Sequence, residues 1–344
     1  MVHLTGMTFR ENEIIVLIGA GCSVDAGIPA SKEMIKQLEG LLKTDGAWKD
    51  FLDFYNFVKS AILYSDGIKG GFCNNFDIER LVNVLSELEK KEDGTLYPFV
   101  GNWNPRLIEI AGYNFQQKSR EFKEKILEEL KKWVSLANYK SAGYYNKLFN
   151  FQSDYNYSLR VFSLNYDLCL EKNRLEVALE RGFDHESRAW SWRSFEPREE
   201  YQPQVFLYKL HGSVDWQRDT EQGNILREVD NEPKIPDLIF GTNYKMQYID
   251  PYLFYAYELR KYSLESKVIL TIGYSFRDEH INGILLQSLK NDKTRKIIIV
   301  SPDADKIVDQ FPQEKNQFIA VKDYAKNFFD KLSIKEIEKL LAQT

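Results

Sequence analysis

Residues 14–21 read Ile-Ile-Val-Leu-Ile-Gly-Ala-Gly, a continuous apolar run that ends in glycine. Strands of a parallel sheet have this composition because helices cover both faces of such a sheet. Ser23 and Asp25 then offer N-cap oxygens, and apolar residues recur with helical spacing over 31–43. The chain is therefore predicted to begin as a strand, a glycine turn and a helix, which indicates an α/β fold.

Further strand-like runs return later in the chain and alternate with helical patterns. The runs lie at 160–165, 205–210, 238–240, 268–272 and 296–300, and the helical patterns at 167–181, 251–264, 279–290 and 303–310. This alternation predicts a Rossmann-like, mainly parallel sheet flanked by helices. Residues 219–237 are polar and predict a loop or short hairpin, and residues 322–342 predict an amphipathic helix.

Residues 47–150 have a different pattern, with aromatic and apolar side chains at helical intervals. A helical stretch of this length between two buried strands exceeds an ordinary crossover connection. We therefore expect two parts. An α/β domain is formed by 1–46 and 151–344, and a mostly helical insertion at 47–150 forms a smaller subdomain.

Charge and composition exclude several protein classes. The 46 basic and 51 acidic side chains give a net charge of −5, which disfavours nucleic-acid binding through a broad basic face. No apolar run approaches the roughly 20 residues that a membrane helix needs, and the N-terminus has no signal pattern. Three scattered cysteines are too few for a disulfide framework or a four-thiolate zinc site. These features predict a cytoplasmic protein without a metal.

The glycine turn is the first chemical signal. Small residues at Gly19, Ala20 and Gly21, followed by Ser23, would let the backbone approach a pyrophosphate at a helix N-terminus. The third glycine of the usual dinucleotide fingerprint is absent, because that position holds Val24, which disfavours a standard dehydrogenase site. A tight turn without a ligand is the alternative, and a positive φ alone would explain Gly27.

Polar clusters end two of the predicted strands: Asn165-Tyr-Asp167 in one case, and His211-Gly in the other. Ligands of open α/β sheets bind beyond the carboxyl ends of strands, where the strand order reverses. An amide there can hold ribose hydroxyls or orient water, and a histidine can transfer a proton. The alternatives are helix capping by Asn165 or Asp167, and a core histidine bonded to backbone.

Two more strand ends carry small or hydroxyl residues, Gly273 with Ser275 and then Ser301. They would face the adenosine half of a dinucleotide. A turn and a helix N-cap are the alternative interpretation.

Together these motifs resemble the sirtuins. The pattern Gly-Ala-Gly-x-Ser-x-x-x-Gly-Ile-Pro, then Asn-x-Asp at a strand end, then His-Gly, runs from about residue 13 to 303 with the helical block as an interruption. The resemblance implies an NAD-binding Rossmann-like domain. It implies that Gly19, Ala20, Gly21 and Ser23 cradle the NAD phosphates. By the same resemblance, Asn165 and Asp167 lie beside the nicotinamide ribose, and His211 is the active-site histidine.

Two departures set the chain apart from sirtuin protein deacylases. No cysteine follows Cys169, so the zinc module of those enzymes is missing, and Pro29 is followed by Ala30-Ser31 where they continue toward Phe-Arg. The segments 210–216 and 272–281, and the helical insertion, resemble instead the bacterial sirtuin-like branch of antiphage defence. That branch hydrolyses NAD and depletes the infected cell.

The resulting expectation is an NAD hydrolase that releases nicotinamide and ADP-ribose, with Asn165, His211 and Asp167 as catalytic residues. Control would come from a homo-oligomer or a partner, such as a DNA-translocase-type ATPase or an Argonaute-like protein. The alternatives are a silent NAD or ADP-ribose sensor and, more remotely, a deacylase. Residues 188–193 could form an aromatic-basic nucleic-acid platform, although a packed hairpin is the commoner explanation of such a stretch.

Overall fold

The computed structural model describes residues 9–68, 70, 76–89, 104–174, 178–196, 202–221, 223–230, 233, 236–240 and 249–343. The chain forms two compact units. Met1–Ile28, Ser135–Leu238 and Met246–Thr344 make up one, which we call the sheet unit. Pro29–Val134 and Ile239–Lys245 make up the other, the helical unit. These boundaries differ from the predicted 46/47 and 150/151, and the assignment of two domains stays a prediction.

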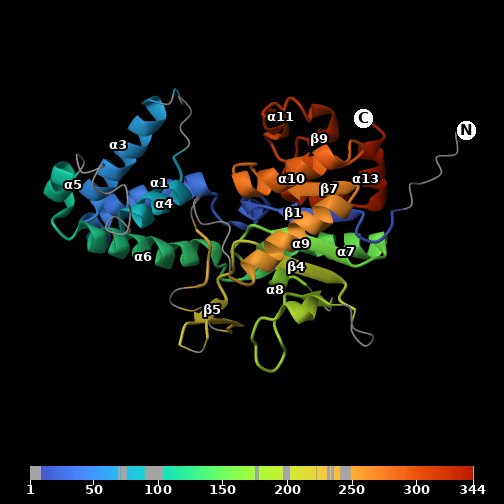
Figure 1. Ribbon diagram of the computed structural model, residues 1–344, viewed down its shortest axis with the longest axis horizontal. Coiled ribbons are helices and arrows are strands. Elements are labelled where there is room, and N and C mark those ends of the chain that lie inside the picture. Colours follow the sequence, from blue (N-terminus) through green and yellow to red (C-terminus); the bar gives the residue numbers. More distant parts are fainter. Residues whose placement is uncertain are drawn as a thin grey trace, which may run out of the picture. The chain divides into compact units, whose positions relative to one another are not determined.

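The sheet unit is built on a seven-stranded parallel sheet of order β3-β4-β2-β1-β7-β8-β9 (Figure 1). Its strands are β1 (Ile14–Ile18), β2 (Leu159–Ser163), β3 (Leu179–Glu180), β4 (Val205–Lys209), β7 (Val268–Ile272), β8 (Lys296–Val300) and β9 (Phe318–Val321). From β1 the chain winds outward through β2 and β4, and from β7 it winds the other way through β8 and β9. The strand order therefore reverses between β1 and β7, as in Rossmann folds, which confirms the predicted fold class.

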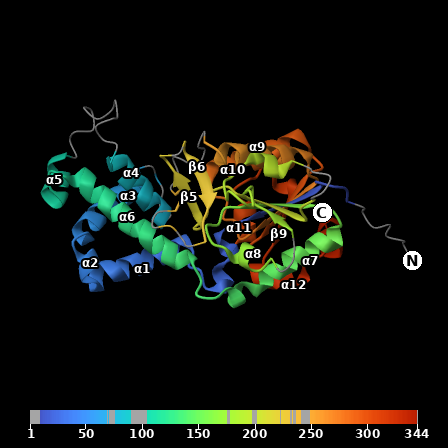
Figure 2. The same cartoon turned by 90° about the horizontal axis from the view of Figure 1, so that it is seen from below.

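Helices cover both faces of this sheet. Figure 2 shows α9 (Tyr252–Glu265) and α10 (Glu279–Asn291) on one face, and α7 (Asn146–Tyr155) and α12 (Ala325–Lys331) on the other. The remaining helices of the unit are α8 (Cys169–Lys172), α11 (Ala304–Val308) and α13 (Ile334–Leu341). All five residues of β1 are buried, as its continuous apolar sequence predicts for a central parallel strand.

Short 3₁₀ turns and a hairpin complete the sheet unit. The turns span η1 (Ala20–Cys22), η2 (Val24–Ala26), η6 (Tyr139–Tyr145), η7 (Trp192–Phe195) and η8 (Lys315–Gln317). The predicted hairpin within 219–237 is confirmed as the antiparallel pair β5 (Trp216–Asp219) and β6 (Ile225–Glu228). Trp190 donates its indole N–H to Tyr255 at 2.8 Å, so packing accounts for this tryptophan of the aromatic-basic stretch.

The helical unit contains α1 (Ser31–Thr44), α2 (Gly46–Lys49), α3 (Leu52–Ile68), α4 (Ile78–Glu89), α5 (Asn104–Ala111) and α6 (Phe115–Val134). An aromatic cluster forms its centre, where Phe51 stacks on Phe122 with ring centroids 5.0 Å apart. Residues 69, 71–75 and 90–103 of the predicted insertion lie outside the described residues.

Several predicted elements need correction. Residues 238–240 form no strand, because Leu238 makes only an isolated bridge to Gly212. The helix predicted over 167–181 is only α8, and Leu179–Glu180 pairs with β4 instead. The single helix predicted over 322–342 is two helices, since Leu332 leaves the helical conformation and Ser333 caps α13 by accepting from the Glu336 N–H.

The strand, turn and helix predicted at the start of the chain also differ in detail. The glycine turn leads into η1 and η2, and α1 begins only at Ser31. Gly27 ends η2 in the left-handed conformation (φ 100°), and Pro29 disfavours helix at the residue before it. The expected helix N-terminus is therefore not formed at the glycine turn.

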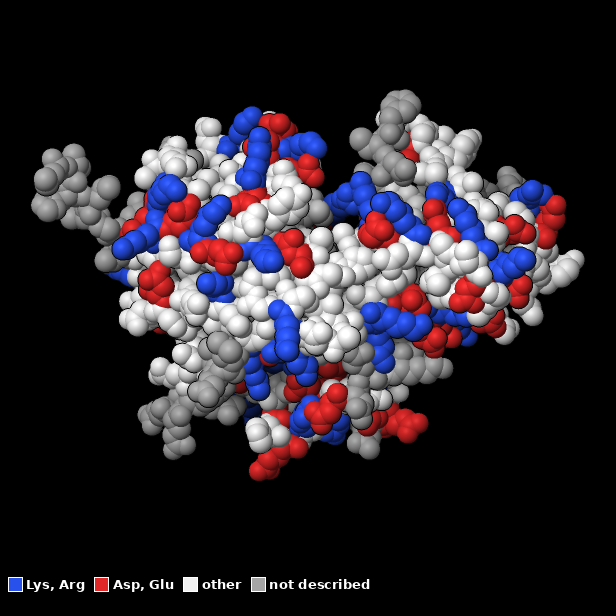
Figure 3. Space-filling view, turned by 180° about the vertical axis from the view of Figure 1, so that it is seen from behind, with Lys and Arg blue, Asp and Glu red and all other residues white. Residues whose placement is uncertain are grey.

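The surface in Figure 3 carries basic and acidic side chains intermixed. On the face shown there, no broad area is basic only, in line with the near balance of charges. None of the helices among the described residues is long and apolar enough to cross a bilayer.

Candidate functional site at the carboxyl edge of the sheet

The turns after β1 and β7 lock together at the point where the strand order reverses. Gly19 N–H donates to the Ile272 carbonyl, and Gly21 N–H to the Gly273 carbonyl, each at 2.9 Å. A Cβ on Gly19 would lie 2.7 Å from the Gly273 carbonyl oxygen. Gly273 has φ 64°, and its Cβ would lie 2.2 Å from the Cys22 nitrogen. These glycines thus allow the turn after β1 to pack closely against the turn after β7, and this packing alone requires glycine at these positions.

The outer rim of the glycine turn is open to solvent. Ala20 and Gly21 are exposed, whereas Ser23 is fully buried. The exposed backbone of Ala20 and Gly21 lies where a ligand beyond the strand ends could reach it. Ser23 lies where a ligand could not reach it without displacing other side chains.

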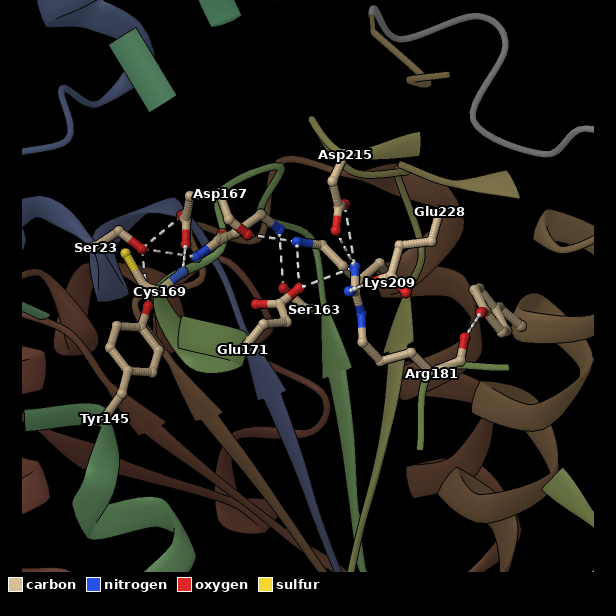
Figure 4. Close-up of polar contacts among 12 residues, drawn as sticks. Ser23, Tyr145, Ser163, Asp167, Cys169, Glu171, Arg181, Lys209, Asp215 and Glu228 are labelled. Atoms are coloured by element: carbon tan, nitrogen blue, oxygen red, sulfur yellow. Dashed lines mark hydrogen bonds and ion pairs between the residues drawn. The ribbon is translucent and has the colours of Figure 1, made fainter. Parts of the chain in front are cut away.

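The Ser23 hydroxyl bonds to three protein groups instead. It donates to Asp167 Oδ2 at 2.7 Å, lies 2.8 Å from Tyr145 Oη, and accepts from Asn165 Nδ2 at 3.2 Å (Figure 4). Ser23 stands at the N-cap of η2, but its side chain does not make the predicted N-cap hydrogen bond. We call Ser23, Tyr145, Asn165 and Asp167 the Ser23 cluster.

Asn165 has a side-chain oxygen that accepts no hydrogen bond from the rest of the cluster. The side chain is buried, with 5% of its surface exposed. Its Nδ2 donates to Ser23, but no described residue donates to Oδ1. A buried amide oxygen without a donor is costly unless a ligand or water supplies one. Asn165 Oδ1 is therefore placed to accept a hydrogen bond from a bound molecule.

Asp167 lies in the cluster, and each of its two oxygens already accepts one hydrogen bond from the protein. Oδ2 accepts from Ser23, and Oδ1 accepts from the Cys169 N–H at 2.9 Å at the start of α8. Asp167 is not the N-cap of α8, because Leu168 holds that position and no side-chain cap bond is formed there. Any catalytic effect of Asp167 would act through Ser23 and Asn165.

His211 follows β4 and is also buried, at 5% exposure. Its Nε2 lies 3.1 Å from Asp278 Oδ2, and Asp278 Oδ1 accepts from the N–H groups of His280 and Ile281 at the start of α10. An ionised carboxylate can only accept, so Nε2 carries the proton of this bond. In the neutral imidazole the other nitrogen, Nδ1, is then the acceptor.

The other predicted ligand contacts lie at the same edge of the sheet. Ser275 is exposed in the turn after β7, and Ser301, partly exposed, follows β8. Ser301 Oγ accepts from the Asp303 N–H at 3.2 Å, so the turn interpretation accounts for its hydroxyl. Gly273 is explained by the packing of the two turns described above.

A buried charge network borders the Ser23 cluster. The Lys209 ammonium donates to the main-chain carbonyl of Asp167 and, at 2.9 Å, to Glu171 Oε1. The Arg181 guanidinium contacts Glu171 at 3.5 Å, Asp215 at 2.9 Å and also Glu228 (Figure 4). We call Lys209, Glu171, Arg181, Asp215 and Glu228 the Arg181 network.

Burial and charge act in opposite directions on this network. Burial disfavours the charged form of Arg181, but Asp215, Glu171 and Glu228 together raise its pKa. Burial alone would raise the pKa of Asp215, but Arg181 and Lys209 hold that pKa below its usual value. Arg181 and Asp215 therefore stay ionised, and the Lys209 ammonium holds the Asp167 carbonyl in place.

Two residues of the site were not predicted from the sequence. Asp278 directly precedes a helical pattern, so an N-cap signal was available to find it. Tyr145 falls inside the stretch predicted as a helical insertion, and no local pattern connects it with Ser23. Among the described residues, no group of three or more His, Cys, Asp or Glu side chains is placed to hold a metal ion.

Comparison with known families agrees with this arrangement. Residues 159–325 match the family model of the SIR2-like domain. This segment, just under half of the chain, is similar to SIR2-like domains. The resemblance to sirtuins is thus confirmed for a segment that includes Asn165, Asp167, His211 and Asp278. The matched segment begins after the glycine turn.

Solved structures of Sir2 proteins are similar to the whole chain at low identity. A Sir2 homolog in complex with NAD is 16% identical and has a TM-score of 0.46, over 95% of this chain and 90% of that one. A mutant Sir2 homologue in complex with ADP-ribose is 15% identical with a TM-score of 0.47, over 96% and 94%. No curated protein matches the chain.

Proposed function

We propose that the SIR2-like domain binds NAD at the carboxyl edge of the sheet and hydrolyses it. The observation that carries this proposal is the buried Asn165 Oδ1 after β2, which has no donor among the described residues, together with a histidine held by a carboxylate after the neighbouring strand β4. The two Sir2 structures with NAD and ADP-ribose support the choice of ligand class.

The reaction consumes NAD and water and yields nicotinamide, ADP-ribose and a proton. The bond between ribose C1′ and the pyridinium nitrogen breaks, and its electron pair leaves with nicotinamide, which becomes neutral. Water adds to C1′, and its proton passes to His211 Nδ1. A positioned base of this kind contributes about 10²–10⁴-fold.

Residues along the carboxyl edge of the sheet would divide the binding and the chemistry between them. Asn165 Oδ1 accepts a hydrogen bond from a ribose hydroxyl or from the attacking water, and Asp278 orients the imidazole. The exposed backbone of Ala20 and Gly21 is placed for the pyrophosphate, and the turns with Gly273, Ser275 and Ser301 for the adenosine half. Because the Ser23 hydroxyl already has three partners, we assign it no contact with NAD.

We also propose that the protein is a cytoplasmic effector of antiphage defence that acts by depleting NAD. The sequence resemblance of 210–216 and 272–281 to the bacterial sirtuin-like branch supports this role. Such an enzyme needs control, either by homo-oligomer formation or by a partner such as a DNA-translocase-type ATPase or an Argonaute-like protein. Light scattering tests the first route, and a fully active monomer would contradict both.

Chromatography of NAD incubated with the purified protein tests the hydrolase proposal. Nicotinamide and ADP-ribose in equal amounts are the expected products. Tight NAD binding without products, even after the oligomer forms, would indicate a sensor instead. An O-acyl-ADP-ribose product formed with an acylated peptide would indicate a deacylase.

A further inference from the structure

We propose that Tyr145 and Ser23 are positioning residues that fix the orientation of the Asn165 amide. In this orientation Oδ1 faces the ligand, so the site selects a hydrogen-bond donor there. This inference rests on the proposed function, because it takes the ligand at Asn165 to be the ribose of NAD or the water that attacks it.

The argument begins with a count of protons at the Ser23 oxygen. A serine hydroxyl has one proton and two lone pairs, whereas the carboxylate of Asp167 can only accept. The Ser23 proton therefore lies in the 2.7 Å bond to Asp167 Oδ2. Both lone pairs remain for Tyr145 Oη at 2.8 Å and the Asn165 amide at 3.2 Å.

Tyr145 supplies one of the two protons that these lone pairs need. Its ring is buried, and burial together with nearby Asp167 raises the pKa of its hydroxyl well above the usual value. The phenol therefore keeps its proton and donates it to Ser23. The ring is held by stacking on Tyr144 at 5.1 Å and by contact with Phe329 at 5.6 Å.

Asn165 then has only one favourable orientation. Its nitrogen must face Ser23, because a flipped amide would set Oδ1 against an oxygen that has no proton left to donate. The main chain is held as well, since Asn165 N–H donates to Ser163 Oγ at 3.1 Å. Oδ1 is thereby directed away from Ser23, buried and without a donor from any described residue.

The consequence is a chemical filter at the ribose. A hydroxyl or a water molecule satisfies Asn165 Oδ1, while a group with only acceptors meets a lone pair. Without Tyr145 Oη, a Ser23 lone pair lacks its donor and the hydroxyl proton can turn away from Asp167. The flipped amide then becomes accessible, and part of the population presents Nδ2 to the ligand.

The test uses the full chain with ADP-ribose as the probe, measured by titration calorimetry. Tyr145→Phe removes one hydroxyl and keeps the ring. Tyr155→Phe is the matched control, because that buried hydroxyl bonds Arg10 and Ile14 at the opposite, amino end of β1. A neutral hydrogen bond is worth about 0.5–1.5 kcal/mol, so Tyr145→Phe should weaken binding about 3- to 10-fold and Tyr155→Phe should not.

A double-mutant cycle separates positioning from a general structural effect. Tyr145→Phe should weaken binding in the wild type but add nothing in the Asn165→Ala background, since no amide is left to orient. Ser23→Ala should show the same dependence on Asn165 and provides a second variant if Tyr145→Phe folds poorly. Melting curves of all variants report folding.

Three results would overturn the inference. The first is a Tyr145→Phe affinity equal to that of Tyr155→Phe, and the second is a Tyr145→Phe loss of the same size with and without Asn165. In both cases Asn165→Ala still weakens binding and the proposed function stands. The third is an unchanged ADP-ribose affinity in Asn165→Ala, which would remove the ribose from this position; if nicotinamide release from NAD is unchanged too, the attacking water is also excluded and the proposed role of Asn165 falls as well.

Discussion

The Ser23 cluster and the Arg181 network meet where Lys209 donates to the Asp167 carbonyl, and they differ in how their buried groups are partnered, although Arg181 Nε itself has no acceptor among the described residues. Each charged side chain of the Arg181 network has a partner of opposite charge within 3.5 Å. In the Ser23 cluster the Ser23 hydroxyl makes three hydrogen bonds, while the buried Asn165 Oδ1 has no donor among the described residues.

This difference separates a structural role from a binding role at the same edge of the sheet. A buried ion-pair network is costly to break, because removal of one partner leaves the other charge buried and unpaired. An unused buried acceptor costs stability in the free protein and is compensated when a ligand or a water molecule donates to it. Variants of the Arg181 network should therefore mainly change stability, and variants around Asn165 should mainly change ligand binding or turnover.

The largest expected effect lies at His211. His211→Ala should lower kcat for NAD hydrolysis by about 10²–10⁴-fold, because the imidazole is the only base that we assign to the attacking water. Measurement of initial nicotinamide release tests this. His185→Ala is the control, since His185 is exposed in a turn, and it should keep full activity. Equal activity of both variants would remove His211 from the mechanism.

Arg181→Met should destabilise the fold by about 3–5 kcal/mol, because Glu171 and Asp215 would remain buried without their shared cation. Urea unfolding followed by circular dichroism measures this change. Arg106→Met is the matched control, because Arg106 is 63% exposed and its pair with Glu109 is at the surface. That variant should lose at most about 1 kcal/mol. Similar losses in the two variants would contradict the contrast between the clusters.

Asp278→Asn should lower kcat roughly tenfold to a hundredfold, less than loss of the imidazole itself. The amide oxygen still caps α10, but His211 Nε2–H loses its carboxylate acceptor and the imidazole its fixed tautomer. Affinity for ADP-ribose should change less than twofold, roughly, since Asp278 is assigned no ligand contact. The neighbouring exposed Glu279→Gln serves as the control. A loss of affinity as large as the loss of kcat would assign Asp278 to binding.

The smallest effect concerns pH. The pKa of Asp215 is lowered in the folded protein from an ordinary 3.8, so in the window below 3.8 the unfolded chain holds a proton that the folded chain does not. The contribution of Asp215 to the free energy of unfolding is fully present above this window. It is lost as the pH falls through the pKa of the folded state, by up to about 1.4 kcal/mol per pH unit. Asp215→Asn should flatten the stability curve between about pH 3 and 4. Parallel curves would contradict the ion pairing.

The sequence predicted the sheet well, because buried strands depend on local patterns. Continuous apolar runs at 14–18 and 268–272 identify buried parallel strands, and the polar residues after them fall at the carboxyl edge by geometry. The short strands β3 and β9 were not predicted. The β3 residues fall inside the helix predicted over 167–181, the β9 residues directly precede the helix predicted over 322–342, and only pairing with β4 and β8 shows them to be strands.

The roles within the site were harder to predict from the sequence. Gly19 and Gly21 were expected to approach a pyrophosphate, but the closest approach is to the turn at Gly273. Ser23 was expected to bind NAD or cap a helix, but its hydroxyl is used by Asp167, Tyr145 and Asn165. These contacts join parts of the chain more than 100 residues apart, so they depend on tertiary packing.

Nicotinamide release by wild-type and Asn165→Ala protein, compared at equal concentration, tests the central claim most directly. The claim is that the unpartnered amide oxygen completes a site that cleaves NAD. We predict that the wild type converts NAD to nicotinamide and ADP-ribose, and that Asn165→Ala melts close to the wild type but loses most of this activity. Equal rates of nicotinamide release from the two proteins would contradict the claim.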